Sequence, residues 1–245
     1  MPRPPALLLL GVLLVLAGCS LPTGPATPTP DRVAPGIAAT GRANASALAA
    51  ANDRTLREGF TLHRNYTDRI PARGDYRMHH ETTVRVGPDF ERFHRVVHTR
   101  ARRNGSVAYT TETWSNGSVV FTRFANATAT RYERHDAARF PYGPGDLTHA
   151  GDVRDLPDGN VTRLDGGRYR LTFAARGVGP RDATRRGAAV FDATGRVFAI
   201  DRDAAFDSRV GRAHVSVTVR WTDRGATTVP RPAWYAAAAN ATQSR

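Results

Sequence analysis

Polar and apolar residues alternate along much of the chain after residue 60. The clearest run is HVSVTVRWT at 214–222, where every second side chain is apolar. Strict alternation indicates a strand with one face in a core and the other in solvent. Comparable runs predict further strands at 60–66, 75–86, 90–100, 107–114, 118–124, 129–134, 168–175, 188–192 and 196–201. The pattern therefore predicts an antiparallel sheet of about nine or ten strands.

Asn-Gly pairs at 104–105 and 116–117 separate two pairs of these runs, as is typical of tight hairpins. A helical pattern occurs once before the strands: Asn44 is a suitable N-cap for a helix to about residue 58, and Gly59 ends it. The segment 140–159 is rich in Gly, Pro and Asp and predicts a long loop with one helical turn, and 234–239 predicts a short closing helix. Residues 37–245 are thus expected to form one α+β domain.

The N-terminus follows a different pattern. Residues 6–17 form an uninterrupted apolar run of 12 residues after one positive charge, Arg3. A membrane-spanning helix needs roughly 20 such residues, so 1–18 is predicted to be a signal peptide. The next residues, LAGC at 16–19, resemble the lipobox of secreted lipoproteins. The resemblance implies cleavage before Cys19 and a lipid on its thiol; an ordinary signal peptide with an incidental cysteine is the alternative.

Residues 19–36 contain five prolines among threonines, so they are predicted to be an extended tether. The predicted location is the extracellular face of the cytoplasmic membrane, with the membrane bound through the lipid on Cys19. Because Cys19 is the only cysteine, no disulfide can form within the chain. The fold must rest on its hydrophobic core.

The formal net charge is +13, and all 35 basic residues are arginine. Two explanations stay open at this point: a GC-rich coding bias, or attraction to anionic lipid headgroups or an acidic cell wall. Nucleic acid is not an expected partner, because an exported protein rarely meets it and the arginines are scattered among the strands.

Seven of the eight asparagines lie in the acceptor pattern for N-glycosylation, and only Asn52 does not. We expect some of these seven to carry sugar, although Asn-Gly-Ser is also good turn chemistry. The predicted sites are Asn44, Asn65, Asn104, Asn116, Asn126, Asn160 and Asn240.

No group of residues predicts catalysis, a metal site or a cofactor. His94 and His98 are four residues apart, which on a strand is about 13 Å and too far to share a metal ion. Ser106 and Ser118 lack the Gly-x-Ser-x-Gly pattern of hydrolases. The segment 201–207 carries three aspartates without the glycine and distal glutamate of a calcium loop. The chain is therefore not expected to be an enzyme.

The lipobox with its tether, the helix at 44–58, FDATGRVFAI and the closing VTVRWTDRGATTVPRPAWY together resemble haloarchaeal surface lipoproteins of unknown function. Those proteins are similar in fold to lipoprotein carriers of the LolA and LppX kind. That resemblance implies a strongly curved antiparallel sheet, a half-open β-barrel, that wraps one main helix and has an apolar concave face.

Two functions from different classes are consistent with these observations. The first is a non-enzymatic cell-surface lipoprotein that binds a lipid or another apolar ligand in the concave face of its sheet. The alternative is a glycosylated structural or interaction lipoprotein of the envelope, with a filled core and envelope proteins as partners.

Overall fold

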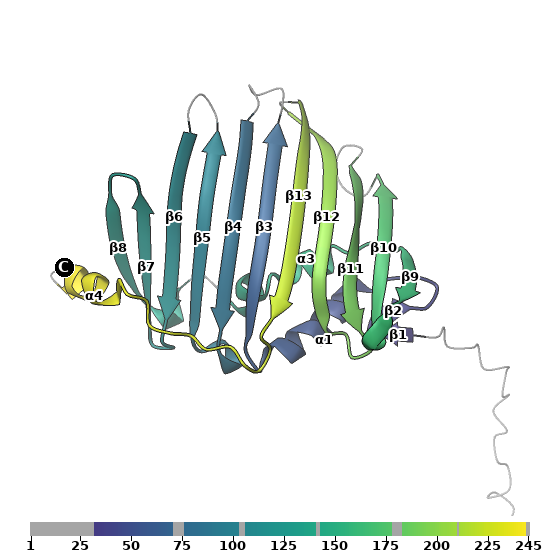
Figure 1. The fold of residues 1–245 in the computed structure, drawn as a ribbon, viewed down its shortest axis with the longest axis horizontal. Helices are drawn as coiled ribbons and strands as arrows, with labels where there is room; N and C mark the ends of the chain where they lie inside the picture. Colours follow the sequence, from purple (N-terminus) through teal and green to yellow (C-terminus); the bar gives the residue numbers. More distant parts are fainter. Residues whose placement is uncertain are drawn as a thin grey trace, which may run out of the picture. The chain divides into compact units, whose positions relative to one another are not determined.

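Eleven strands form one antiparallel sheet in the order β8-β7-β6-β5-β4-β3-β13-β12-β11-β10-β9 (Figure 1). The computed structural model describes residues 32–70, 76–102, 106–140, 143–177, 183–209 and 211–243, which belong to the compact unit 31–245. The strands of the sheet are β3 (Phe60–Ile70), β4 (Tyr76–Val86), β5 (Phe93–Arg102), β6 (Ser106–Ser115), β7 (Val119–Asn126), β8 (Thr130–Asp136), β9 (Asn160–Arg163), β10 (Arg168–Arg176), β11 (Thr184–Asp192), β12 (Val197–Ser208) and β13 (Gly211–Thr222).

The chain builds this sheet in two halves. Strands β3 to β8 each pair with the next, and the chain then crosses to β9 at the opposite edge. Strands β9 to β13 lead back toward the centre, where β13 pairs with β3 and Trp221 lies opposite Leu62. The pairing of β3 with β13 therefore joins the two halves.

Three helices pack on one face of the sheet, which we call the helix-bearing face. They are α1 (Ala45–Leu56), α2 (Pro144–Thr148) and α3 (Ala150–Arg154). Asn44 caps α1, because its Oδ1 accepts a hydrogen bond from the Ala47 amide at 3.1 Å. Leu48 and Leu56 of α1 and Val153 of α3 are fully buried in the same cluster as apolar side chains of β3, β4, β10, β11, β12 and β13. Burying each such side chain contributes about 1.5–3 kcal/mol.

A fourth helix, α4 (Tyr235–Gln243), lies on the other face, which we call the polar face. Its Ala238 packs with Trp114 of β6 and Phe121 of β7. Val120 belongs to the core of the helix-bearing face, and the next residue, Phe121, points to the opposite face because neighbouring side chains of a strand alternate. Since α4 packs on Phe121, it covers that opposite face. Two short strands, β1 (Arg32–Ala34) and β2 (Ile37–Ala38), pair beside the main sheet, and β1 begins inside the range predicted for the tether.

The α+β class and the antiparallel sheet are confirmed, but the strand count is eleven, not nine or ten. The missed strand, β9, has only four residues, too few for a visible alternation. The predicted loop at 140–159 holds two short helices, α2 and α3. The sheet is open, with β8 and β9 as its edges. Its strong curvature, and the wrapping of one helix, stay predictions. No helix among the described residues is long and apolar enough to cross a membrane.

Candidate ligand-binding face

The helices cover only part of the helix-bearing face. In Figure 1, α1 and α3 lie behind the lower half of the central strands. By alternation, the same face continues along β3–β6 from the buried Leu62 and Val84 to side chains nearer the upper ends of these strands, over which none of the described helices lies. We call this group the upper patch: Tyr66, Met78, His80, Thr99, Ala101, Val107 and Tyr109.

The upper patch is the most exposed apolar part of this face. Val107 is 58% exposed and Tyr109 is 42% exposed, and they are the exposed large hydrophobic residues of the described chain. Met78, Ala101 and Val107 form one row across β4, β5 and β6. Apolar side chains on adjacent strands are within reach of one another, so this row offers a continuous apolar surface.

One hydrogen bond and one ring contact join polar side chains within the patch. His80 Nδ1 lies 2.9 Å from Thr99 Oγ1, and the rings of His80 and Tyr66 are 5.8 Å apart. Burial, and then the charge of Arg64, lowers the pKa of His80. Burial, and then Asp68, raises the pKa of Tyr66. Both shifts favour the uncharged forms, so His80 and Tyr66 add no charge to the patch at neutral pH.

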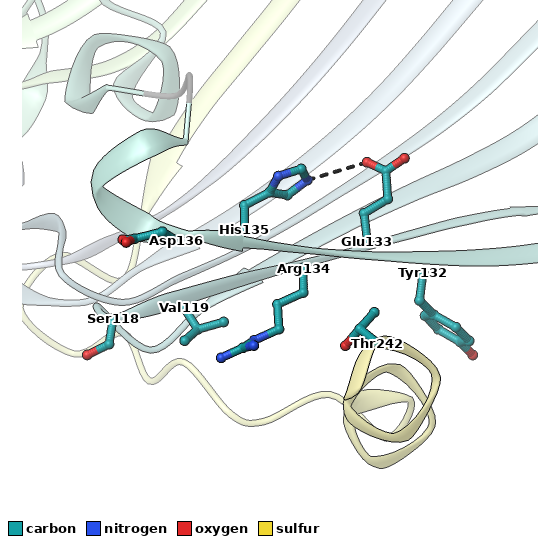
Figure 2. A pocket seen from close by; sticks show the side chains of 8 residues that line it. All are labelled: Ser118, Val119, Tyr132, Glu133, Arg134, His135, Asp136 and Thr242. Carbon is teal, nitrogen blue, oxygen red and sulfur yellow. Dashed lines mark hydrogen bonds and ion pairs between the residues drawn. The ribbon is translucent and has the colours of Figure 1, made fainter. Parts of the chain in front are cut away.

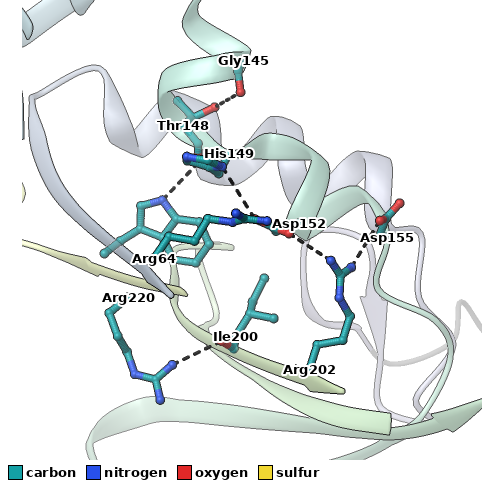
Figure 3. Close-up of polar contacts among 10 residues, drawn as sticks. Arg64, Gly145, Thr148, His149, Asp152, Asp155, Ile200, Arg202 and Arg220 are labelled. Carbon is teal, nitrogen blue, oxygen red and sulfur yellow. Dashed lines mark hydrogen bonds and ion pairs between the residues drawn. The ribbon is translucent and has the colours of Figure 1, made fainter. Parts of the chain in front are cut away.

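An ion network joins α3 to the sheet (Figure 3). It borders the patch through Arg64, whose guanidinium carbon lies 5.1 Å from the centre of the Tyr66 ring. Asp152 Oδ2 accepts from Arg64 Nε at 3.0 Å, and Oδ1 accepts from Arg202 Nη2 at 3.0 Å. Arg202 Nη1 also donates to Asp155 Oδ2 at 3.2 Å. Two carboxylates therefore balance the two guanidinium groups, and the network ties α3 to β3 and β12.

His149 joins α2 to α3 next to this network. Its backbone has φ of +53°, a left-handed conformation that is uncommon outside glycine. Its Nδ1 lies 3.8 Å from Asp152 Oδ2. Burial, and then Arg64, lowers the pKa of His149, so the imidazole is neutral at neutral pH. With both oxygens of Asp152 already bound to arginine, the arrangement serves to hold α3, and it is not the base-and-nucleophile pair that catalysis would need.

A hollow of about 470 Å³ lies at β7, β8 and α4, and its lining includes Ser118 and His135. Figure 2 shows Glu133 and His135 on one side of the β8 ribbon and Ser118 and Arg134 on the other. His135 Nε2 is 3.4 Å from Glu133 Oε2. Because Ser118 points away from this pair, the three residues do not form a nucleophile-and-base arrangement.

The other polar residues that the sequence singled out are separate in the structure. Within the described ranges, no three His, Cys, Asp or Glu side chains are grouped as a metal site would require. His98 Nδ1 contacts Thr110 Oγ1 at 2.9 Å, whereas His94 Nε2 lies 3.4 Å from Glu112 Oε2. The three aspartates at 201–207 each face an arginine across the sheet, in the pairs Asp201–Arg220, Asp203–Arg186 and Asp207–Arg212.

The predicted modification sites divide into described and undescribed residues. Cys19 and Asn104 lie outside the described residues. The remaining acceptor asparagines are all exposed: Asn44, Asn65, Asn116, Asn126, Asn160 and Asn240. In contrast Asn52, which has no acceptor pattern, is 1% exposed, and its Oδ1 accepts from the Val197 amide at 2.9 Å. Glycosylation of the exposed asparagines stays a prediction.

Sequence reasoning missed the Asp152 network and the upper patch. Arg64 and Asp152 are 88 residues apart, and Arg202 and Asp152 are 50 apart. Asp152 stands directly before the apolar Val153, which was a signal that this carboxylate lies close to the core. The sequence does not show which arginines pair with it.

No protein-family model matches the chain, and no curated protein is similar to it. Among solved structures, a LolA superfamily protein from Nitrosomonas europaea is similar over 77% of this chain and 94% of its own, at 10% identity and a TM-score of 0.27. The MucA/MucB complex of Pseudomonas aeruginosa is similar over 78% of this chain and 100% of the matched chain, at 10% identity and a TM-score of 0.17. Similarity at this level does not define a family or a function for the chain.

Proposed function

We propose that this protein is a non-enzymatic cell-surface lipoprotein that binds a lipid or another apolar ligand on the upper patch. The observation that carries the proposal is the exposure of Val107 and Tyr109, 58% and 42%, on the face whose lower half is a buried core. Exposed apolar surface that continues a core favours an apolar ligand, because contact removes that surface from water.

The cellular location in this proposal rests on the N-terminal sequence. The apolar run at 6–17 and Cys19 favour export and a lipid anchor. Since one acyl chain binds a membrane only marginally, stable anchoring would need a second chain or a further attraction. A protein held at the membrane would have acyl chains as the apolar molecules nearest to it.

Photocrosslinking in the membrane tests the ligand. The full chain, in the membranes of the cells that express it, is irradiated with a diazirine-labelled phospholipid, and the labelled peptides are mapped by mass spectrometry. We expect label on β5 and β6, and a several-fold loss of that label in Val107→Asp, because a carboxylate is costly to bring into contact with an acyl chain.

Ala108→Asp is the matched control. It places the same charge one residue along β6, on the polar face, where Ala108 is already exposed. This variant should label as the wild type does. Equal labelling of the two variants, or label spread evenly over both faces, would overturn the proposal. Absence of lipid label, together with envelope proteins that co-purify with the chain, would instead support the structural or interaction lipoprotein.

A further inference from the structure

A hollow of about 840 Å³ lies on the polar face near the β9 edge. Its floor is one row of side chains across four strands, in which Arg170 pairs with Val190, Val190 with Ala199, and Ala199 with Arg220. The hollow lies on the opposite face from the upper patch, so the ligand proposed above does not account for it.

Positive charge dominates the hollow. Four arginines line it, Arg163, Arg168, Arg170 and Arg220, against one acidic residue, Asp165. Arg220 Nη2 donates to both carboxylate oxygens of Asp201, at 2.8 Å each. Asp201 therefore offsets the charge of Arg220, and the other charged lining residues are three arginines and Asp165.

Two of these arginines have no acidic partner. Arg170 lies between Thr162 and Val190 on the neighbouring strands, and neither is charged. Within the part of the chain that the structure describes, Arg163 and Arg170 make no ion pair. Both residues are exposed. Arg170 belongs to the row on the polar face and is open to an anion from solution, whereas Arg163 lies opposite Tyr169, which packs against the core of the helix-bearing face.

The third arginine is held in place by an aromatic ring. The Arg168 guanidinium carbon lies 4.3 Å from the centre of the Phe198 ring, and that of Arg224 lies 5.9 Å from the same centre. Arg224 is fixed by its contacts with Asn52 and the Val197 carbonyl. Asp192 lies across the strand from Arg168, but its Oδ1 accepts from the amides of Thr194 and Arg196. A stacked guanidinium keeps its edge free for hydrogen bonds to an oxyanion.

We propose that this arginine-lined hollow binds a molecule with a phosphate group, recognised by Arg168 and Arg170. Guanidinium groups match the oxygens of a phosphate in geometry and charge. The hollow is large enough to hold a second phosphate or an organic part of the ligand beside one phosphate. An anionic phospholipid headgroup and a soluble phosphorylated compound share this chemistry.

The test uses the full chain in neutral detergent, with two probes. Pyrophosphate is titrated by calorimetry at fixed salt, and phosphatidylglycerol retention is followed by native mass spectrometry. Arg170→Gln is expected to weaken binding of the recognised probe about tenfold, since one charge-assisted hydrogen bond is lost. Arg77→Gln removes the same charge from an exposed position at the upper end of β4 on the same face, outside the hollow, and should change binding less than about twofold.

Each outcome decides the proposal. Selective weakening in Arg170→Gln supports it, and the probe that shows the effect identifies a soluble phosphate compound or a lipid headgroup as the source. Equal weakening by Arg77→Gln means that the net charge of +13 attracts anions without a site, and overturns it. Failure of both probes to bind overturns it as well, and leaves the proposal for the upper patch untouched.

Discussion

Single residues hold the helices to this sheet, and Asp152 is the clearest case. Its side chain is 7% exposed and lies between Arg64 and Arg202, whose side chains are 18% and 12% exposed. A buried ion pair contributes little net stability when it is intact, because both partners lose hydration. Its removal is costly, because the remaining charges stay buried without compensation.

Replacing Asp152 with Asn should therefore destabilise the protein by about 3–5 kcal/mol, because two guanidinium groups lose their carboxylate. Urea unfolding followed by circular dichroism measures the change. Asp155→Asn is the control: Asp155 also binds Arg202 but is 53% exposed, so its loss should cost less than about 1 kcal/mol. Similar midpoints for the two variants would show that the network does not hold α3.

The C-terminal segment illustrates how an element can be fixed by one polar contact and one aromatic cluster. The Tyr235 ring lies 5.2 Å from the rings of both Trp114 and Phe121, edge to face. Trp234 Nε1 donates to Glu112 Oε2 at 2.7 Å. The short hydrophobic sequence YAAAA has little amphipathic character, so these contacts, more than its own pattern, hold α4 on the polar face.

Glu112 should make this docking sensitive to acid. The adjacent His94, followed by Trp234 and Arg123, lowers the pKa of Glu112 from 4.5 to about 2, although burial opposes the shift. A pKa that is lower in the folded state stabilises the fold above pH 4.5, and this contribution is lost as the pH falls toward 2. The Glu112→Gln variant lacks this contribution to stability at every pH.

Urea unfolding across this pH range provides the measurement. The difference in stability between wild type and Glu112→Gln should be largest at neutral pH and shrink steadily below pH 4.5. Glu81→Gln, at an exposed position of the same face, is the control and should show a difference that is small throughout. A constant difference for Glu112→Gln down to pH 2 would contradict the prediction.

At the scale of the whole molecule, the two faces of the sheet carry different candidate binding surfaces. The helix-bearing face carries the core and the apolar upper patch, whereas the polar face carries ion pairs between strands and the arginine-lined hollow. The exposed acceptor asparagines are distributed over strands, turns and α4, so sugars would surround the domain and would not mark one surface.

The mass of the intact protein tests the predicted processing. Cleavage before Cys19 leaves 245 − 18 = 227 residues, and lipid on Cys19 and sugars on asparagine each add mass. Protein extracted from its own cells should be heavier than this bare chain, and enzymatic removal of sugars should leave the mass of the lipid. A measured mass equal to that of the 227 residues would refute both modifications.

The sequence determined those features that depend on neighbouring residues. Alternation located the long strands, because a strand with one buried face must repeat every two residues, and Asn44 marked the start of α1. It did not reveal β9, which is too short for a repeat, nor the two helices within 140–159, whose Gly and Pro residues resemble a loop.

Only the tertiary structure decided which distant residues meet. The pairing of β13 with β3 places side by side residues that are about 150 positions apart in the chain. It forms only when the two halves of the sheet, β3–β8 and β9–β13, come together. The Asp152 network, the uncovered patch around Val107 and the arginine-lined hollow each combine side chains from several strands. Alternation tells which residues share a strand face, but the order of strands and the reach of the helices decide what covers that face.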